Sequence, residues 1–141
     1  MAPCVICSII EDKIPAQKVY EDDHCLAFLD IYPAAPGHTI IVPKVHISRV
    51  EDLTPDQAQG LFYALYKILY SIRSAVGADA TTIGINNGPG SGQEIPHVHI
   101  HILPRRRGDL GGIIQQLGPG AEGDINKIAE RIRTEVLKIK K

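Results

Sequence analysis

The stretch that decides the fold of this chain reads His97-Val98-His99-Ile100-His101-Ile102-Leu103. Histidine and aliphatic residues alternate in it, and successive side chains of an extended strand point to opposite faces. We therefore expect a β-strand that buries its aliphatic residues and carries three imidazoles on one face. Imidazoles titrate near neutral pH, and a rigid strand positions chemical groups better than a loop does. The row of histidines indicates a chemical site.

Three interpretations of this row stay open on the residues alone. Histidines at i and i+2 lie roughly 6.5–7 Å apart along a strand, so two of them could chelate one metal ion together with ligands from elsewhere. A nucleophile or base with flanking helper groups is the second interpretation. The third is three solvent-facing or hydrogen-bonded histidines that have no chemical role.

The length, charge and cysteine content of the chain limit the class of protein to which it can belong. Its 141 residues suffice for one domain with its own core, and its net charge of -1 argues against a nucleic-acid-binding protein. No apolar run is long enough to cross a bilayer. Three cysteines, two of them in Cys4-Val5-Ile6-Cys7, favour a metal or redox role over a disulfide. We expect a cytoplasmic protein without nucleic-acid or membrane partners.

Hydrophobic patterns outside the histidine stretch predict further elements, with strands at 19–21, 25–30, 38–42 and 81–86. The clearest helix begins with the capping box Thr54-Pro55-Asp56-Gln57, continues with apolar residues at helical spacing and ends at Gly77. A second helix is expected over about 124–139. This order favours an α+β domain over 1–141, with a mostly antiparallel sheet and helices packed on one side.

A glycine-rich loop, Asn87-Gly88-Pro89-Gly90-Ser91-Gly92-Gln93, directly precedes the histidine stretch. It offers backbone N–H groups, a hydroxyl and amides, which are the donors that hold an anion such as phosphate. A neutral imidazole nitrogen attacks phosphorus well near pH 7 and leaves well in a second step. The loop and the histidines together favour nucleophilic attack on a phosphate group.

These motifs resemble those of the histidine triad (HIT) family of nucleotide hydrolases and transferases. His97–Leu103 is similar to the family's H-φ-H-φ-H-φ-φ signature, segments 26–31 and 36–46 resemble its second block, and 86–93 resembles its phosphate loop. The resemblance implies a single HIT-like domain with one long central helix and a C-terminal helix. It also implies a homodimer, formed through the helix that starts at Thr54 and the adjoining strand.

The resemblance implies a covalent mechanism. His99 matches the nucleophile, which attacks the α-phosphorus of a purine nucleotide derivative, either a phosphoramidate or a dinucleoside polyphosphate, and forms a nucleotidyl-histidine. His101, His97 and His38 match residues around the phosphate that donate hydrogen bonds or carry protons. The leaving group and the preferred base stay open.

The resemblance also implies which residues bind the nucleotide. Asp30 matches the residue that accepts both ribose hydroxyls, a task suited to the two oxygens of a carboxylate. Phe28 and Ile31, with Ile9 or Ile6, would line an apolar slot for the base. The phosphate would be held by Asn86, Gly92, Gln93, His99 and His101.

Cys4 and Cys7 can chelate one ion, but tetrahedral zinc needs two more ligands. Some prokaryotic-type members of the family complete such a site with the histidine after the P-K-x-H turn and with the first triad histidine. Those positions are His46 and His97 here, so the resemblance implies a structural zinc site. A pair of small core cysteines or a redox pair is the alternative. If His97 binds zinc, it orients its neighbours rather than moving protons.

Two other functions remain open beside nucleotide hydrolysis. One is a nucleotide-binding regulatory protein with vestigial hydrolysis, and the other is a zinc-dependent hydrolase that activates water. The chain departs from many relatives at Glu94, where they carry serine or threonine. A carboxylate there would repel polyphosphate and favour a cationic or amine leaving group. Arg105, in the triplet 105–107, is a further candidate for a phosphate contact.

Overall fold

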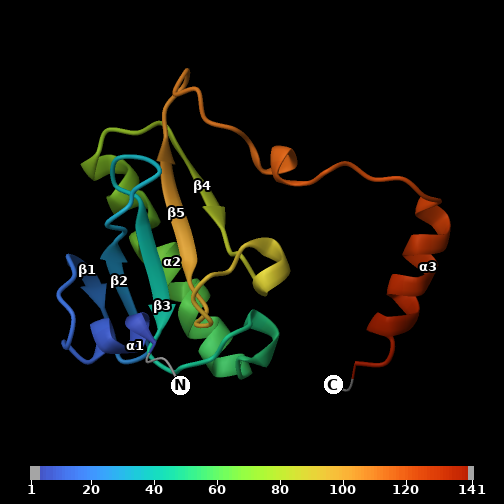
Figure 1. Ribbon diagram of the computed structural model, residues 1–141, viewed down its shortest axis with the longest axis horizontal. Helices are drawn as coiled ribbons and strands as arrows, with labels where there is room; N and C mark the ends of the chain where they lie inside the picture. The colour runs from blue at the N-terminus through green and yellow to red at the C-terminus, as the bar shows by residue number, and fades with distance from the viewer. Residues whose placement is uncertain (1–3, 140–141) are drawn as a thin grey trace. The chain divides into compact units, whose positions relative to one another are not determined.

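The computed structural model describes residues 4–139 (Figure 1). The chain divides into two compact units, residues 1–111 and 112–141. The single domain expected over 1–141 therefore stays a prediction, and its ends at 1–3 and 140–141 lie outside the described residues. Among the residues that were searched, no helix is long and apolar enough to cross a membrane.

Unit 1 is built on a five-stranded antiparallel sheet with the order β1-β2-β3-β5-β4 (Figure 1). The strands span Lys18–Glu21 (β1), Cys25–Leu29 (β2), Thr39–Pro43 (β3), Ala80–Gly84 (β4) and Ile100–Arg105 (β5). The α+β class and the antiparallel sheet are thus confirmed. Short 3-10 helices, η1 (Val50–Asp52) and η2 (Pro89–Ser91), lie in the connections.

The long helix α2, Pro55–Ala75, begins as the sequence predicts. The hydroxyl of Thr54 accepts from the N–H of Gln57, and the Gln57 side chain accepts from the N–H of Thr54, which completes the capping box. The helix ends at Ala75, just before Gly77, which has a φ of 65°. Its buried face, Leu61, Ala64, Leu65 and Ile68, packs on the sheet beside Ile100 and Ile102.

The expectation that the helices lie on one side of the sheet is wrong for α1, Val5–Ile10. Ile6 and Ile9 of α1 pack with Leu26, Phe28 and Val42, whereas the alternate residues of β2 and β3 belong to the core beneath α2. The two helices therefore cover opposite faces of the sheet. A helix of six residues is too short to show a helical period in the sequence, which is why the prediction missed it.

The histidine stretch becomes a strand three residues later than predicted, because β5 begins at Ile100. Val98, Ile100 and Ile102 are buried as expected. The preceding segment is not paired with a strand: the N–H of Val98 donates to the carbonyl of Ile47 at 2.8 Å, in the loop after β3. The three histidines consequently do not share one regular strand face.

A tight turn between β2 and β3 places the buried His38. Gly37 has a φ of 85°, and a Cβ built on it would lie 2.9 Å from a methyl group of Val76. Both facts require glycine, because L-residues with a side chain avoid this backbone region and this space is filled. The turn therefore joins the start of β3 to the end of α2.

Unit 2 contains η3, Ile114–Leu117, and α3, Ile125–Val136. The Asp124 side chain caps α3 by accepting from the N–H of Asn126. The predicted C-terminal helix is thus confirmed, three residues shorter at its end than expected. Its apolar residues Ile125, Ile132 and Val136 are exposed.

Candidate active site

A pocket of about 590 Å³ lies on the face of the sheet that α1 covers. Strand register explains part of its wall, since Phe28 pairs with Ile40 and Ile40 pairs with His101 across β2, β3 and β5. Directly paired residues of neighbouring strands project their side chains from the same face. This row joins the apolar wall under α1 to the histidines.

The pocket brings together most of the predicted site residues, namely Phe28, Asp30, Ile31, Asn86, Gly92, His99 and His101. Ile6 and Ile9 line it as well, so the predicted apolar slot is a continuous surface. Gln93, His38 and His97 do not line it. The sequence interpretation missed Ile14, Tyr32, Ile40 and Ile95, which also line the pocket; only the strand register, which is not readable from one sequence, would have identified Ile40.

His99 is held in one tautomer by a main-chain carbonyl. Its Nδ1 lies 2.7 Å from the carbonyl oxygen of His97, and a carbonyl oxygen only accepts hydrogen bonds. The proton of the neutral ring is therefore on Nδ1, which leaves the lone pair on Nε2. The side chain is 8% exposed and lines the pocket, so a single ring nitrogen is available as a nucleophile.

His38 and His101 form a chain of hydrogen bonds with one direction. The N–H of Ala34 donates to Nδ1 of His38 at 3.1 Å, so the proton of the neutral His38 ring is on Nε2. That nitrogen lies 2.9 Å from Nδ1 of His101 and donates to it. The proton of neutral His101 is then on Nε2. His101 thereby offers an N–H donor to the pocket that it lines.

Burial keeps both of these histidines neutral at physiological pH. Burial lowers the pKa of His38 in spite of the nearby Asp30 carboxylate, whose Oδ2 lies 3.7 Å from Nε2. Burial and the neighbouring His99 and His38 lower the pKa of His101 to about 4. His101 is therefore a neutral hydrogen-bond donor near pH 7, with a defined tautomer.

Gln93 supports the glycine loop with its own side chain. Its Oε1 accepts from the N–H of Gly88 at 2.7 Å, and its Nε2 donates to the carbonyl of Ser48 at 2.8 Å. Asn87 adds a second link, because its Oδ1 accepts from the N–H of Val50. The loop that precedes the histidines is thus fastened to the segment after His46.

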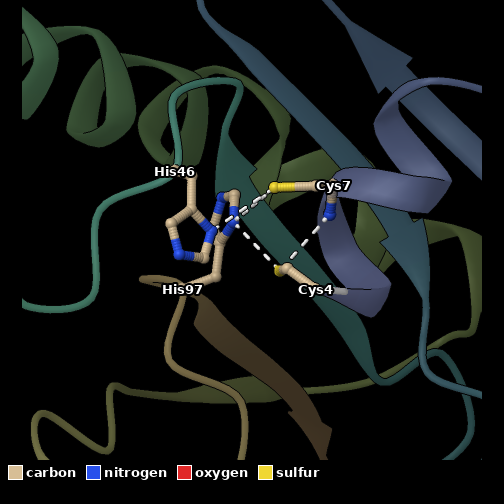
Figure 2. A group of neighbouring side chains, drawn as sticks. All are labelled: Cys4, Cys7, His46 and His97. Atoms are coloured by element: carbon tan, nitrogen blue, oxygen red, sulfur yellow. Dashed lines mark hydrogen bonds between the residues drawn. The ribbon is translucent and has the colours of Figure 1, made fainter. Parts of the chain in front are cut away.

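A second cluster lies outside the pocket (Figure 2). The ligand atoms of Cys4, Cys7, His46 and His97 all lie within 4.8 Å of one another. Nδ1 of His97 is 3.6 Å from each sulfur, and Nδ1 of His46 is 3.4 Å from Sγ of Cys7. For Zn–S and Zn–N bonds of ordinary length, a tetrahedral site has S···N edges of about 3.6 Å. The spacing fits a tetrahedral metal.

The orientation of His97 also fits a metal ligand. Its Nε2 lies 2.8 Å from the carbonyl oxygen of Pro43, which accepts the ring proton and leaves the lone pair of Nδ1 facing the two sulfurs. Four protein donors complete a tetrahedral shell, whereas catalytic zinc keeps a position open. The donor set therefore suits a structural zinc ion. His97 is buried in this cluster and not among the groups that line the pocket.

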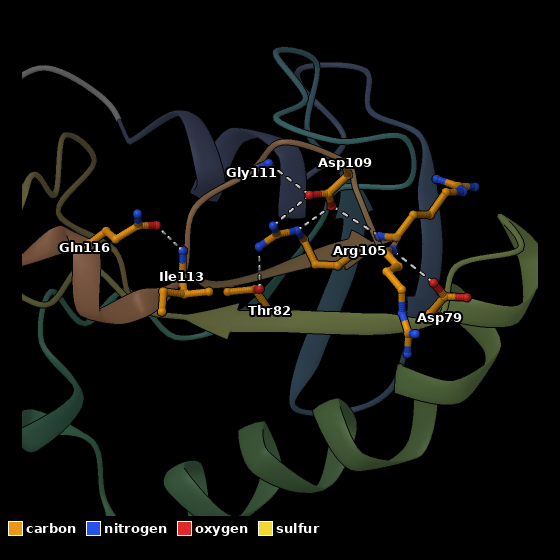
Figure 3. Close-up of polar contacts among 9 residues, drawn as sticks. Asp79, Thr82, Arg105, Asp109, Gly111, Ile113 and Gln116 are labelled. Atoms are coloured by element: carbon orange, nitrogen blue, oxygen red, sulfur yellow. Dashed lines mark hydrogen bonds and ion pairs between the residues drawn. The ribbon is translucent and has the colours of Figure 1, made fainter.

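Arg105 is directed elsewhere than to a phosphate (Figure 3). Its Nε and Nη2 donate to the two oxygens of Asp109, and Nη1 donates to the hydroxyl of Thr82. The hydrogen bonds from Arg105 hold the pKa of the Asp109 carboxyl well below its usual range. Arg105 does not line the pocket, so the candidate phosphate contact is not observed. Its role is to fold the chain back after β5.

The family model for the HIT domain matches residues 11–108, which covers the sheet, α2, the glycine loop and all three histidines of the motif. The chain belongs to the HIT family. An uncharacterised HIT-like protein of Methanocaldococcus jannaschii is 39% identical over 130 residues, which is 92% of this chain and 98% of that protein. The crystal structure of a Streptococcus mutans protein has a TM-score of 0.86 at 37% identity, covering 96% of this chain and 87% of that one.

Some HIT relatives carry the names of hydrolases that act on small nucleotide derivatives. The adenosine 5'-monophosphoramidase of Saccharomyces cerevisiae is 35% identical over 92% of this chain and 78% of its own length. The asymmetrical bis(5'-nucleosyl)-tetraphosphatase of Schizosaccharomyces pombe is 36% identical over 69% and 53%. A zinc-bound histidine triad protein of Mycobacterium smegmatis has a TM-score of 0.72 at 32% identity, over 96% and 94%. These names support a hydrolase in general.

The hydrogen-bond chain gives a pH prediction. Between pH 8 and 5, His101 should remain the neutral Nε2–H tautomer, because its pKa lies at about 4. Two-bond ¹H–¹⁵N correlation spectra would show Nδ1 as an acceptor over this range. His38→Ala should raise the pKa of His101 toward 6.5 and mix the tautomers. A wild-type His101 that titrates near pH 6.5 would contradict this assignment.

The lowered pKa of His101 also makes the free energy of unfolding depend on pH. The unfolded chain binds a proton at His101 near pH 6.5, whereas the folded chain binds it only near pH 4. The contribution of neutral His101 to the free energy of unfolding is therefore fully present above pH 6.5. It is lost as the pH falls from 6.5 to 4.

Proposed function

We propose that this HIT-family chain is a nucleotide hydrolase or nucleotidyl transferase that acts through a nucleotidyl-His99 intermediate. The observation that carries the proposal is the fixed tautomer of His99, whose Nε2 lone pair belongs to a ring lining the pocket. Phosphoryl chemistry needs a nucleophile that is neutral near pH 7 and that leaves well in the second step. The substrate is a purine nucleotide derivative, such as a phosphoramidate or a dinucleoside polyphosphate.

The reaction has two displacements at the α-phosphorus. Nε2 of His99 donates its lone pair to phosphorus, and the bond to the leaving group breaks with its electron pair on the leaving atom. Water then attacks phosphorus and returns the Nε2 electron pair to His99, which releases a nucleoside monophosphate. Overall one water is consumed: its hydroxyl joins phosphorus and its proton balances the leaving group. The Nε2–H of His101 stabilises the phosphate oxygens in both steps.

The rest of the pocket holds the nucleoside. Asp30, with one oxygen already accepting from the N–H of Tyr32, presents its carboxylate to the ribose hydroxyls. Phe28, Ile31 and the α1 isoleucines form the apolar wall for the base. Asn86 and Gly92 lie on the glycine loop beside the phosphate, while Gln93 keeps this loop in shape. His38 acts through His101, and His97 acts through its carbonyl on His99.

The mechanism predicts the behaviour of His99→Ala. This variant should lose roughly a thousandfold or more of nucleoside monophosphate release, because no other group forms the covalent intermediate. Its affinity for the nucleoside monophosphate, measured by calorimetry, should change little. In the wild-type protein, acid quenching during turnover followed by mass spectrometry should show one nucleotidyl adduct on His99. Full turnover by the variant would exclude the mechanism, and a wild-type protein that binds without an adduct would favour the regulatory alternative.

We also propose that Cys4, Cys7, His46 and His97 hold a structural zinc ion. The S₂N₂ donor set and its spacing support this, as does the orientation of His97 toward both sulfurs. Zinc would link α1, which forms a wall of the pocket, to the segment that carries His99. Two thiolates persist as ligands in a reducing compartment, which agrees with the cytoplasmic location expected from the sequence.

The zinc proposal predicts about one zinc ion per chain in freshly purified protein. Cys7→Ser should lose the metal and lower Tm by about 10 °C, because the site joins separate segments of the fold. Cys25→Ala removes a cysteine that lies outside the cluster and should keep the full zinc content. Metal analysis by mass spectrometry and a thermal melt measure both effects. A folded wild-type protein that contains no zinc would contradict the proposal.

We propose that the chain forms a homodimer through α2 and the edge strand β4. Phe62, Tyr63, Tyr66 and Tyr70 are exposed by 58–73% and follow one face of α2. The outer edge of β4 is unpaired in the sheet. An apolar helix face and an open strand edge are features that proteins cover in an oligomer. A second copy of this chain offers the matching surfaces by two-fold symmetry.

The dimer proposal predicts that the wild-type protein elutes in light-scattering chromatography at twice the mass of the chain. Phe62→Glu combined with Tyr66→Glu should raise the dissociation constant by about a hundredfold or more, since two aromatic anchors are lost. Val19→Glu, which adds charge at an exposed position of β1 on the opposite edge of the sheet, should leave the mass unchanged. A monomeric wild-type protein would refute the dimer.

A further inference from the structure

The charged groups around the pocket are unusual for a site that takes a phosphate. The charged residues that line it are Asp30 and Glu94, both acidic, and no lysine or arginine appears among its described lining residues. His101 adds no positive charge near pH 7, since its pKa is about 4. Proteins that hold several phosphate groups usually supply lysine or arginine. The described lining of this pocket therefore offers a phosphate no lysine or arginine.

Nearby cations are directed to other partners. The Arg49 guanidinium lies against Gly88 on the glycine loop, and its Nη1 is 3.7 Å from a carboxylate oxygen of Glu51. Arg105 is bound by both oxygens of Asp109. Neither arginine lines the pocket. The two pocket carboxylates are therefore not neutralised by a cation that shares the pocket with them.

The carboxylates of Asp30 and Glu94 differ in the contacts that they make with the rest of the protein. Asp30 accepts from the N–H of Tyr32, lies 3.7 Å from His38 and has a side chain that is 19% exposed. Glu94 is exposed and forms no hydrogen bond or ion pair with any residue in the described part of the chain. It directly follows the glycine loop and lines the same pocket as Gly92 and His99. Its charge is therefore available to interact with the leaving group of a bound substrate.

We propose that Glu94 determines leaving-group specificity, selecting amines that carry a positive charge and disfavouring anionic leaving groups such as polyphosphate. The inference rests on the proposed reaction at His99 and names its preferred substrate class, nucleoside phosphoramidates of cationic amines. An unpaired carboxylate that lines the same pocket as His99 attracts an ammonium group and repels a carboxylate or phosphate. The effect acts on the part of the substrate that departs, so it leaves recognition of base and ribose to the other pocket residues.

Three adenosine 5'-phosphoramidates test this assignment, with 2-aminoethylamine, propylamine or 3-aminopropanoate as the leaving amine. The chain lengths are similar, while the charge of the remote group is positive, zero or negative at pH 7. The measured quantity is kcat/KM for release of AMP, followed by chromatography. The wild-type protein should favour the cationic over the anionic substrate, and Glu94→Gln should reduce that ratio by roughly three- to tenfold. Glu94→Lys should invert the preference, and Glu94→Asp should retain it.

Two controls separate the charge effect from a structural one. Asp23→Asn removes the same charge from an exposed residue of unit 1 that does not line the pocket, and this variant should keep the wild-type ratio. Raising the salt concentration should lower the ratio of the wild-type protein and leave that of Glu94→Gln nearly constant, because salt screens an exposed charge. Equal ratios in the wild-type protein and Glu94→Gln would overturn the assignment of Glu94 alone. No turnover of any of the three substrates by the wild-type protein would overturn this inference. The proposed function would fall only if a dinucleoside polyphosphate were not hydrolysed through His99 either.

Discussion

The hydrogen bond from Nδ1 of His99 to the carbonyl of His97 is the interaction on which the rest of the site depends. It places the only available lone pair of the His99 ring on Nε2. His97 performs a second task at the same time, because its own ring is fixed between Pro43 and the two cysteines. One residue thus connects a tetrahedral donor cluster to the proposed nucleophile through its main chain. The cluster and the pocket are separate sites, and the main chain of His97 connects them.

The side chains of β2 are buried on both faces of the sheet, and one of these faces carries the pocket. One set of the β2 side chains completes the core under α2, and the other set, with Leu26 and Phe28, is covered by α1. The C-x-x-C pair lies at the start of α1, where the Cys4 sulfur also accepts from the N–H of Cys7. The proposed zinc would anchor this short helix through its cysteines and so hold Ile6 and Ile9 over the sheet. The proposed metal and the apolar wall therefore depend on the same six-residue helix.

The sequence predicted well those features that a local pattern encodes. The capping box at Thr54, the antiparallel strands and the burial of Val98, Ile100 and Ile102 all follow from spacing and residue type. For side chains that meet from distant segments, only the family resemblance supplied a prediction, which brought Cys4, Cys7, His46 and His97 together, and the residues alone left such contacts open. The i, i+2 metal chelate within the histidine row is not formed, because His97 turns toward Cys4 while His101 meets His38, 63 residues away. The amide of Gln93 likewise serves its own loop, for a reason that only the position of Ser48 reveals.

The neutrality of the histidines has a consequence for how the pocket treats charge. Burial disfavours imidazolium at His38 and His101, so in the proposed reaction a phosphate would be bound through oriented N–H groups instead of through positive charge. Oriented dipoles act mainly on the atoms they touch, whereas a net charge acts over a longer range. Since His101 contributes no positive charge near pH 7 and no lysine or arginine lies in the described lining, neither offsets the exposed carboxylate of Glu94. The same burial that keeps His101 neutral is thus what would give Glu94 its proposed influence over the leaving group.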